Sequence, residues 1–161
     1  MRREGGDFMK ILVINGPNIN MIGIREPAIY GRSDYRDLER YILESLMELG
    51  GDVQGGIECE VFQSNHEGDL VDRIQQAYFD DTDGIIINPG AYTHTSIAIM
   101  DALKAVSLPA VEVHFSDISE RESFRHISYA GMACVKTYKG FGFEGYKKAI
   151  AFLKEHLRQA G

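Results

Sequence analysis

An arginine and a tyrosine in one long connecting segment are the residues of this sequence best suited to acid–base chemistry. Arg25 and Tyr30 lie between an apolar run that ends at Asn15 and a helical pattern that begins at Ser33. A phenol has a pKa of about 10 and is a poor base at neutral pH, but a guanidinium beside it favours the phenolate. The segment predicts an enzyme in which both residues act on a small anionic substrate. A surface loop held by Pro27 is the structural alternative.

The same segment has the features of a lid. Gly23 and Gly31 flank it and could serve as hinges. Connections of this length without regular structure are uncommon in a compact domain and are usually functional.

Asparagine and histidine side chains collect where predicted strands end. These points are 15–18, 63–67, 88–94 and 112–116, and they include His66, His94 and His114. In an open parallel sheet the carboxyl ends of the strands share one edge, where ligands bind. The histidines lack a metal-site spacing such as HExxH, so each alone is more often a hydrogen-bonded loop or core residue. The sequence therefore predicts a polar site without a metal at this edge.

Two further arginines follow the fourth predicted strand. Arg121 and Arg125 are four residues apart, so on a helical turn they would share a face. With Arg25 they would form a local cationic patch suited to an anionic substrate. Ordinary solvated charge is the alternative for each.

Apolar runs and amphipathic runs alternate along the chain. Strands are expected at 10–15, 57–63, 84–88, 109–114 and 133–138, and helices at 33–50, 67–80, 95–106 and 145–159. Ser33 is expected to cap the first helix, Tyr78 to face inward on the second, and the third helix to be buried on two faces. The alternation implies a parallel sheet with helices on both faces. We predict a flavodoxin-like three-layer α/β/α sandwich with a five-stranded parallel sheet.

Length and composition fit one soluble domain of 161 residues. Residues 1–8 show no strand or helix period and are expected to be a flexible N-terminal extension, followed by a single catalytic domain at 9–161. No apolar run approaches the roughly 20 residues of a membrane helix. The net charge of -7 argues against non-specific nucleic-acid binding. Cys59 and Cys134 lie far apart in apolar runs, which predicts small buried core residues in a cytoplasmic protein.

A glycine pattern near the carboxyl terminus has two interpretations. Gly140, Gly142 and Gly145 spell GxGxxG between a predicted strand and a helix. A dinucleotide site would need a further strand with an acidic residue about 20 positions on, and only one helix follows. We therefore favour a tight strand-to-helix turn.

Seven segments together resemble the type II 3-dehydroquinate dehydratases. In chain order they are 15–18, 23–31, 63–68, 88–96, 112–116, 121–126 and 140–146. The resemblance runs in order over nearly the whole chain. It implies a cofactor-independent and metal-free enzyme that assembles as a homododecamer, a tetramer of trimers. The implied reaction is the dehydration of 3-dehydroquinate to 3-dehydroshikimate by anti elimination through an enolate, in the shikimate pathway of aromatic amino acid biosynthesis or in quinate breakdown.

The resemblance also implies which residues handle the proton and the enolate. Tyr30 corresponds to the base that takes a proton from the carbon beside the ketone. Arg25 corresponds to the cation that keeps Tyr30 ionised, and Arg121 to a second arginine beside it. Asn18 corresponds to the residue that holds a water molecule against the enolate oxygen.

The leaving hydroxyl and the substrate carboxylate are implied to meet other strands. His114 corresponds to the general acid, with Glu112 orienting it. Asn88 and the backbone of Phe115 and Ser116 correspond to the carboxylate site.

Contacts to the ring hydroxyls are implied for His94 and Arg125. Asp101 corresponds to a residue that reaches into the site of a neighbouring subunit. Ile127 departs from the family, which usually has a histidine there.

Two other classes of protein remain as alternatives on the sequence. A flavodoxin-like binding module for a phosphate or a nucleotide would need no base, but no convincing phosphate loop is present. A metal-dependent hydrolase would use the histidines as ligands.

Overall fold

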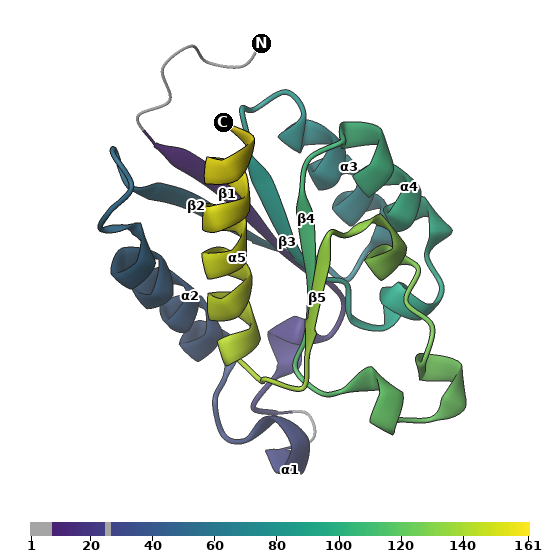
Figure 1. The fold of residues 1–161 in the computed structure, drawn as a ribbon. Helices are drawn as coiled ribbons and strands as arrows, with labels where there is room; N and C mark the ends of the chain where they lie inside the picture. Colours follow the sequence, from purple (N-terminus) through teal and green to yellow (C-terminus); the bar gives the residue numbers. More distant parts are fainter. Residues whose placement is uncertain (1–7, 25–26) are drawn as a thin grey trace.

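A parallel sheet of five strands runs through the middle of the molecule, with helices on both faces (Figure 1). This computed structural model describes residues 8–24 and 27–161, without the side chains at 29 and 30. The strands lie in the order β2-β1-β3-β4-β5 and all pair in parallel. Their bounds are β1 Met9–Asn15, β2 Ile57–Gln63, β3 Gly84–Asn88, β4 Ala110–His114 and β5 Lys136–Lys139. The predicted flavodoxin-like α/β sandwich is confirmed.

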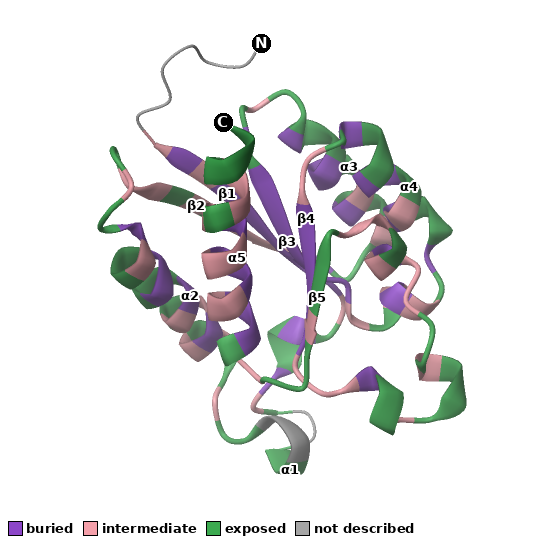
Figure 2. Ribbon diagram, in the orientation of Figure 1, coloured by how far each residue is buried: buried purple, intermediate pink, exposed green. Residues whose placement is uncertain are grey.

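The three central strands are almost wholly buried, whereas the edge strands are not (Figure 2). A strand covered by helices on both faces needs apolar side chains on both, which explains the continuous Ile, Val and Leu runs of β1 and β3. At the edge, β5 is short and mostly exposed. The predicted fifth strand began too early, because Ala133 belongs to the 3-10 turn η5 (Ala130–Ala133).

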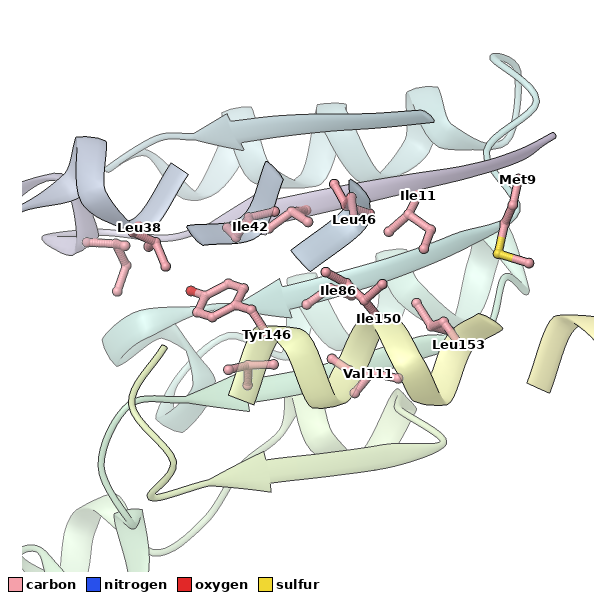
Figure 3. Close-up of a cluster of buried hydrophobic side chains, with 14 of the residues drawn as sticks. Met9, Ile11, Leu38, Ile42, Leu46, Ile86, Val111, Tyr146, Ile150 and Leu153 are labelled. Atoms are coloured by element: carbon pink, nitrogen blue, oxygen red, sulfur yellow. The ribbon is translucent and has the colours of Figure 1, made fainter. Parts of the chain in front are cut away.

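Two pairs of helices form the outer layers (Figure 1). The helices α2 (Tyr35–Gly50) and α5 (Glu144–Ala160) cover one face, and α3 (Glu67–Ala77) and α4 (Ile97–Val106) cover the other. Figure 3 shows side chains of α2 and α5, including Ile42 and Ile150, packed against Ile11 and Ile86 of the sheet. The helices α2 and α5 thus pack the stripes that their apolar spacing predicts against the sheet.

Three details of the helices differ from prediction. Asp34, not Ser33, caps α2, because its carboxylate accepts from the Asp37 amide at 3.0 Å while the Asp37 carboxylate accepts from the Asp34 amide. Helix α3 ends at Ala77, so Tyr78 lies beyond the buried stripe and is 65% exposed. Helix α4 is buried on one face only, since Ile97 is 52% exposed.

The loops after β1 and β3 pack backbone against backbone. A Cβ on Gly16 would lie 2.3 Å from the Pro89 carbonyl oxygen, and one on Gly90 would lie 2.8 Å from the Pro17 carbonyl oxygen. Only glycine allows this approach at both positions. The two loops are thereby fixed against each other at the carboxyl edge of the sheet.

None of the helices in the described part of the chain has the length and apolar character needed to cross a membrane.

Candidate active site

A cavity of about 300 Å³ opens at the carboxyl ends of β1, β3 and β4. Its lining combines the loops after these three strands with the 3-10 turns η3 (Ile118–Glu120) and η4 (Ser123–Arg125). The lining residues are Pro17, Asn18, Ile19, Asn88, Gly90, Ala91, His94, His114, Phe115, Ser116, Ile118, Arg121 and Arg125. The site therefore lies at the edge that the polar strand ends predict.

A buried carboxylate–imidazole pair lies at the cavity, with His114 in the lining and Glu112 bonded to it. His114 and Glu112 alternate along β4, and the His114 Nε2 lies 2.6 Å from the Glu112 Oε1. The exposed fractions of the two residues are 6% and 1%. With Nε2 engaged by the carboxylate, Nδ1 is the ring nitrogen left for a ligand in the cavity.

Three hydroxyl groups complete the surroundings of Glu112. Thr93 donates to Oε1 at 2.6 Å, Ser128 also donates to Oε1, and Thr137 donates to Oε2 at 3.0 Å. Burial opposes ionisation of this carboxyl, but the hydrogen bonds from His114, Ser128 and Thr93 outweigh it and lower the pKa to about 2. Glu112 therefore stays ionised and can stabilise a positive charge on His114.

Residues 127 and 128, which follow η4, hydrogen-bond to a second histidine and to the Glu112 carboxylate. Besides Ser128, this segment supplies the Ile127 carbonyl oxygen, which accepts from the His94 Nδ1 at 2.8 Å. A carbonyl oxygen can only accept, so the proton of a neutral His94 is on Nδ1. Burial, opposed by that hydrogen bond, lowers the pKa of His94. A neutral His94 thus offers Nε2 as an acceptor for a hydroxyl hydrogen.

Arg121 and Arg125 bring positive charge to the cavity, but from two turns rather than one. Arg121 directly follows η3 and Arg125 ends η4, so the predicted shared helical face is wrong although both residues line the cavity. The Arg125 Nε donates to the Glu122 carboxylate at 2.9 Å.

The remaining lining residues bring amides and backbone to the cavity. Asn88 accepts from the Gly90 amide at 3.2 Å and donates to the Tyr146 hydroxyl at 3.1 Å. Asn18 has a left-handed backbone with φ of 67°, and its backbone N–H donates to the side-chain oxygen of Asn65. Phe115 and Ser116 follow β4 directly and line the cavity beside His114.

Four predicted site residues are not placed in the cavity lining. Glu112 contacts the lining residue His114 but does not itself line the cavity. Arg25 lies outside the described residues. Tyr30 ends the short helix α1 (Pro27–Tyr30), whose backbone is described, but its side chain is outside the description. Asp101 is exposed on α4 and does not line the cavity of its own chain. The backbone at Gly23 and Gly31 has φ of 87° and 72°, which favours glycine on both sides of this segment.

The histidines do not form a metal cluster. His66 precedes α3, is exposed, and does not line the cavity that His94 and His114 line. Over residues 8–24 and 27–161, no three His, Cys, Asp or Glu side chains gather in a group that could hold a metal ion.

Sequence reasoning missed the residues that hold Glu112. Thr93 and Ser128 are 19 and 16 residues from Glu112 and have no spacing that relates them to it. Gly131 was also missed: a Cβ there would lie 2.5 Å from the Glu112 Oε2. Only the folded chain brings these residues to the carboxylate.

Fold and site together define a class of protein, an α/β enzyme with a polar, cationic cavity at the carboxyl edge of a flavodoxin-like sheet. Residues 9–154 match the family model described as "Dehydroquinase class II". The chain belongs to this family, and it is an enzyme of the type II dehydroquinases.

Similar proteins cover the same length. A 3-dehydroquinate dehydratase of Clostridium perfringens is 53% identical over 150 residues, 93% of this chain and 99% of that protein. The crystal structure of a type II dehydroquinase from Butyrivibrio crossotus has a TM-score of 0.86 and 52% identity, and covers 92% of this chain and 99% of its own. A type II dehydroquinase from Propionibacterium acnes superposes with a TM-score of 0.82 at 40% identity, over 91% of this chain and 96% of that one.

Proposed function

We propose that this chain dehydrates 3-dehydroquinate to 3-dehydroshikimate by anti elimination, with Tyr30 as the base and His114 as the general acid. The observation that carries the mechanism is His114, which lines the cavity together with two arginines and is bonded to the buried carboxylate of Glu112. An ionised carboxylate bonded to Nε2 favours the imidazolium, whose Nδ1 proton can be given to a leaving hydroxyl.

The proposed reaction has two chemical steps. Tyr30, as the phenolate, removes a proton from the carbon beside the ketone, and the electron pair moves onto the ketone oxygen to give the enolate. Asn18 holds a water molecule that donates to this oxygen. The enolate then collapses, a carbon–carbon double bond forms, the carbon–oxygen bond breaks, and the hydroxyl leaves as water with the proton from His114. The products are the enone and one water molecule.

Cations near the base are part of the proposal. A phenol is mostly neutral at pH 7, and lowering its pKa by about 3 units takes roughly 4 kcal/mol of differential interaction. Arg25 and Arg121 are proposed to supply this by favouring the phenolate of Tyr30. All proton transfers are assigned to side chains, so the scheme requires no metal or cofactor.

Substrate binding is assigned to the other lining residues. Asn88 and the backbone of Phe115 and Ser116 are proposed to bind the carboxylate. His94 and Arg125 are proposed to bind the ring hydroxyls, and the free Nε2 of a neutral His94 suits that contact.

A homododecamer, built as a tetramer of trimers, is proposed as the assembly. In that arrangement Asp101 completes the site of a neighbouring subunit, which agrees with its exposure on α4 outside its own cavity. Both cysteines are free, which supports a cytoplasmic location.

The direct test is the absorbance of the conjugated enone formed when the purified chain is mixed with 3-dehydroquinate. Steady formation of the enone is expected. If folded protein gives none, the proposed function is wrong.

Tyr30→Phe tests the base. The variant keeps the ring and removes only the hydroxyl, so we expect turnover to fall by about 10³-fold or more while substrate affinity changes little. Turnover comes from the enone assay and affinity from calorimetric titration. Turnover within tenfold of the parent would reject Tyr30 as the base.

A further inference from the structure

A buried chain of three polar side chains lies directly beneath the cavity. Asn88 donates to the Tyr146 hydroxyl at 3.1 Å, and that hydroxyl donates to the Asn15 Oδ1 at 2.7 Å. The exposed fractions of Asn88, Tyr146 and Asn15 are 2%, 0% and 0%. Of these residues only Asn88 lines the cavity.

The sheet and one helix bring the three side chains together. Asn15 and Asn88 are paired in register at the carboxyl ends of β1 and β3. Residues paired in neighbouring strands point to the same face of a sheet. Tyr146 bonds to both from the first turn of α5. In Figure 3 its hydroxyl is turned away from Ile150 and Leu153.

A glycine of the pattern at 140–145 makes this contact possible. A Cβ on Gly145 would lie 3.0 Å from a methyl group of Val113, so glycine lets the start of α5 approach β4 closely. The approach places the next residue, Tyr146, over the strand ends. The turn that a nucleotide site would use for phosphate here positions a phenol.

The Gly90 backbone N–H, at one end of this row of hydrogen bonds, determines the direction of each of them. The Gly90 backbone N–H can only donate, so the Asn88 oxygen faces Gly90 and the Asn88 nitrogen faces Tyr146. The phenol oxygen accepts from that nitrogen, so its own proton goes to the Asn15 oxygen. Burial raises the pKa of Tyr146, so this proton stays in place across the working pH range.

From this row of hydrogen bonds we infer that Tyr146 is a positioning residue. It holds the Asn88 amide so that an N–H rather than a carbonyl oxygen faces the ligand. An amide nitrogen carries two protons, and the phenol takes one of them. The second is available to a ligand in the cavity. A reversed amide would present lone pairs and repel a carboxylate. The inference rests on the proposed role of Asn88 in binding the substrate carboxylate.

A kinetic double-mutant cycle with Tyr146→Phe and Asn88→Ala tests the inference on the full chain. Tyr146→Phe removes only the hydroxyl, so the Asn88 amide keeps its bond from Gly90 but loses the partner that holds its nitrogen. We expect KM for 3-dehydroquinate to rise about tenfold while kcat changes less than about threefold. In the Asn88→Ala background the same change should add less than about twofold, because the phenol acts through the missing amide. KM is the readout since it does not depend on the concentration of folded enzyme.

Two further variants support the cycle. Asn15→Ala keeps the phenol but removes the acceptor of its proton, so the same rise in KM is expected. Tyr138→Phe is the matched control, because Tyr138 lies on β5 and does not line the cavity. Its KM should equal that of the parent.

The outcomes separate the inference from the function on which it rests. If Asn88→Ala raises KM but Tyr146→Phe and Asn15→Ala do not, the positioning role is wrong and the carboxylate contact stands. If the effects of Tyr146→Phe and Asn88→Ala multiply, the phenol acts by another route and the inference is again wrong. An unchanged KM in Asn88→Ala would overturn the proposed carboxylate contact itself.

Discussion

Two clusters of charged side chains in this molecule show how similar interactions serve different ends. One is the pair of Glu112 and His114 at the carboxyl edge of the sheet. The other joins Arg73 of α3 to Glu60 and Asp80, at 2.8 and 2.9 Å, with Lys10 near Asp80. Arg73 is 8% exposed, so both clusters include a deeply buried charged group.

The difference lies in the partners. In the Arg73 cluster permanent charges of opposite sign face one another, and the pKa of Glu60 is lowered chiefly by its hydrogen bond from Arg73. Glu112 is instead surrounded by neutral hydroxyls and by an imidazole, the side chain that changes charge most readily near neutral pH. In the Arg73 cluster, permanently charged partners stabilise one another and thereby the fold. Around Glu112 the hydroxyl donors are neutral, so the His114 imidazole is the group that can change its charge.

The largest expected effect is the loss of turnover when the His114 imidazole is removed. His114→Ala should lower kcat by about 10³-fold, because the leaving hydroxyl loses its acid. The enone assay measures it. Retention of more than a tenth of the activity would show that another group protonates the hydroxyl.

Glu112→Gln should lower kcat by about a hundredfold, since the amide keeps the shape but removes the charge that favours the imidazolium. Glu60→Gln is the matched control, a carboxylate-to-amide change in the other cluster, and it should leave kcat unchanged. If both substitutions lowered kcat equally, the proposed functional difference between the two clusters would be wrong.

The Arg73 cluster should respond in stability and not in turnover. Arg73→Met leaves the Glu60 and Asp80 carboxylates without their shared partner, and we expect the free energy of unfolding to fall by about 2 kcal/mol, since both carboxylates retain access to water. Urea denaturation measures the loss, and kcat per folded enzyme should stay within twofold. A tenfold loss of kcat would mean that this cluster supports the site.

Acid should produce the smallest effect that separates the clusters. Burial opposes the shift at Asp80, and hydrogen bonding dominates at Glu60, but the pKa of each is lowered in the fold. Groups with depressed pKa values stabilise the fold above their unfolded pKa of about 4, and that contribution is lost as the pH falls toward the folded value. The melting temperature should therefore decline from about pH 5 downward. The decline should be shallower in Arg73→Met, and an identical slope would contradict the coupling.

The central strands and the helices could be predicted from the sequence because local patterns determine them. Buried parallel strands require continuous apolar runs, and the wholly buried β3 was predicted with the bounds it has, Gly84–Asn88. The errors fell where tertiary context decides. The exposed edge strand β5 has no apolar signal of its own, and the choice of Asp34 over Ser33 as cap depends on reciprocal hydrogen bonds.

The sequence by itself determined the layered fold, the edge of the sheet that carries the site, and the identity of most residues around the cavity. These follow from periodicity, from the common direction of parallel strands and from the order of the motifs. Tertiary structure alone decided how those side chains are held: which hydroxyls surround Glu112, and how Tyr146 comes to lie between Asn88 and Asn15. Hydrogen bonds across 58 and 131 residues depend on strand register and helix packing, and neither leaves a mark in local spacing.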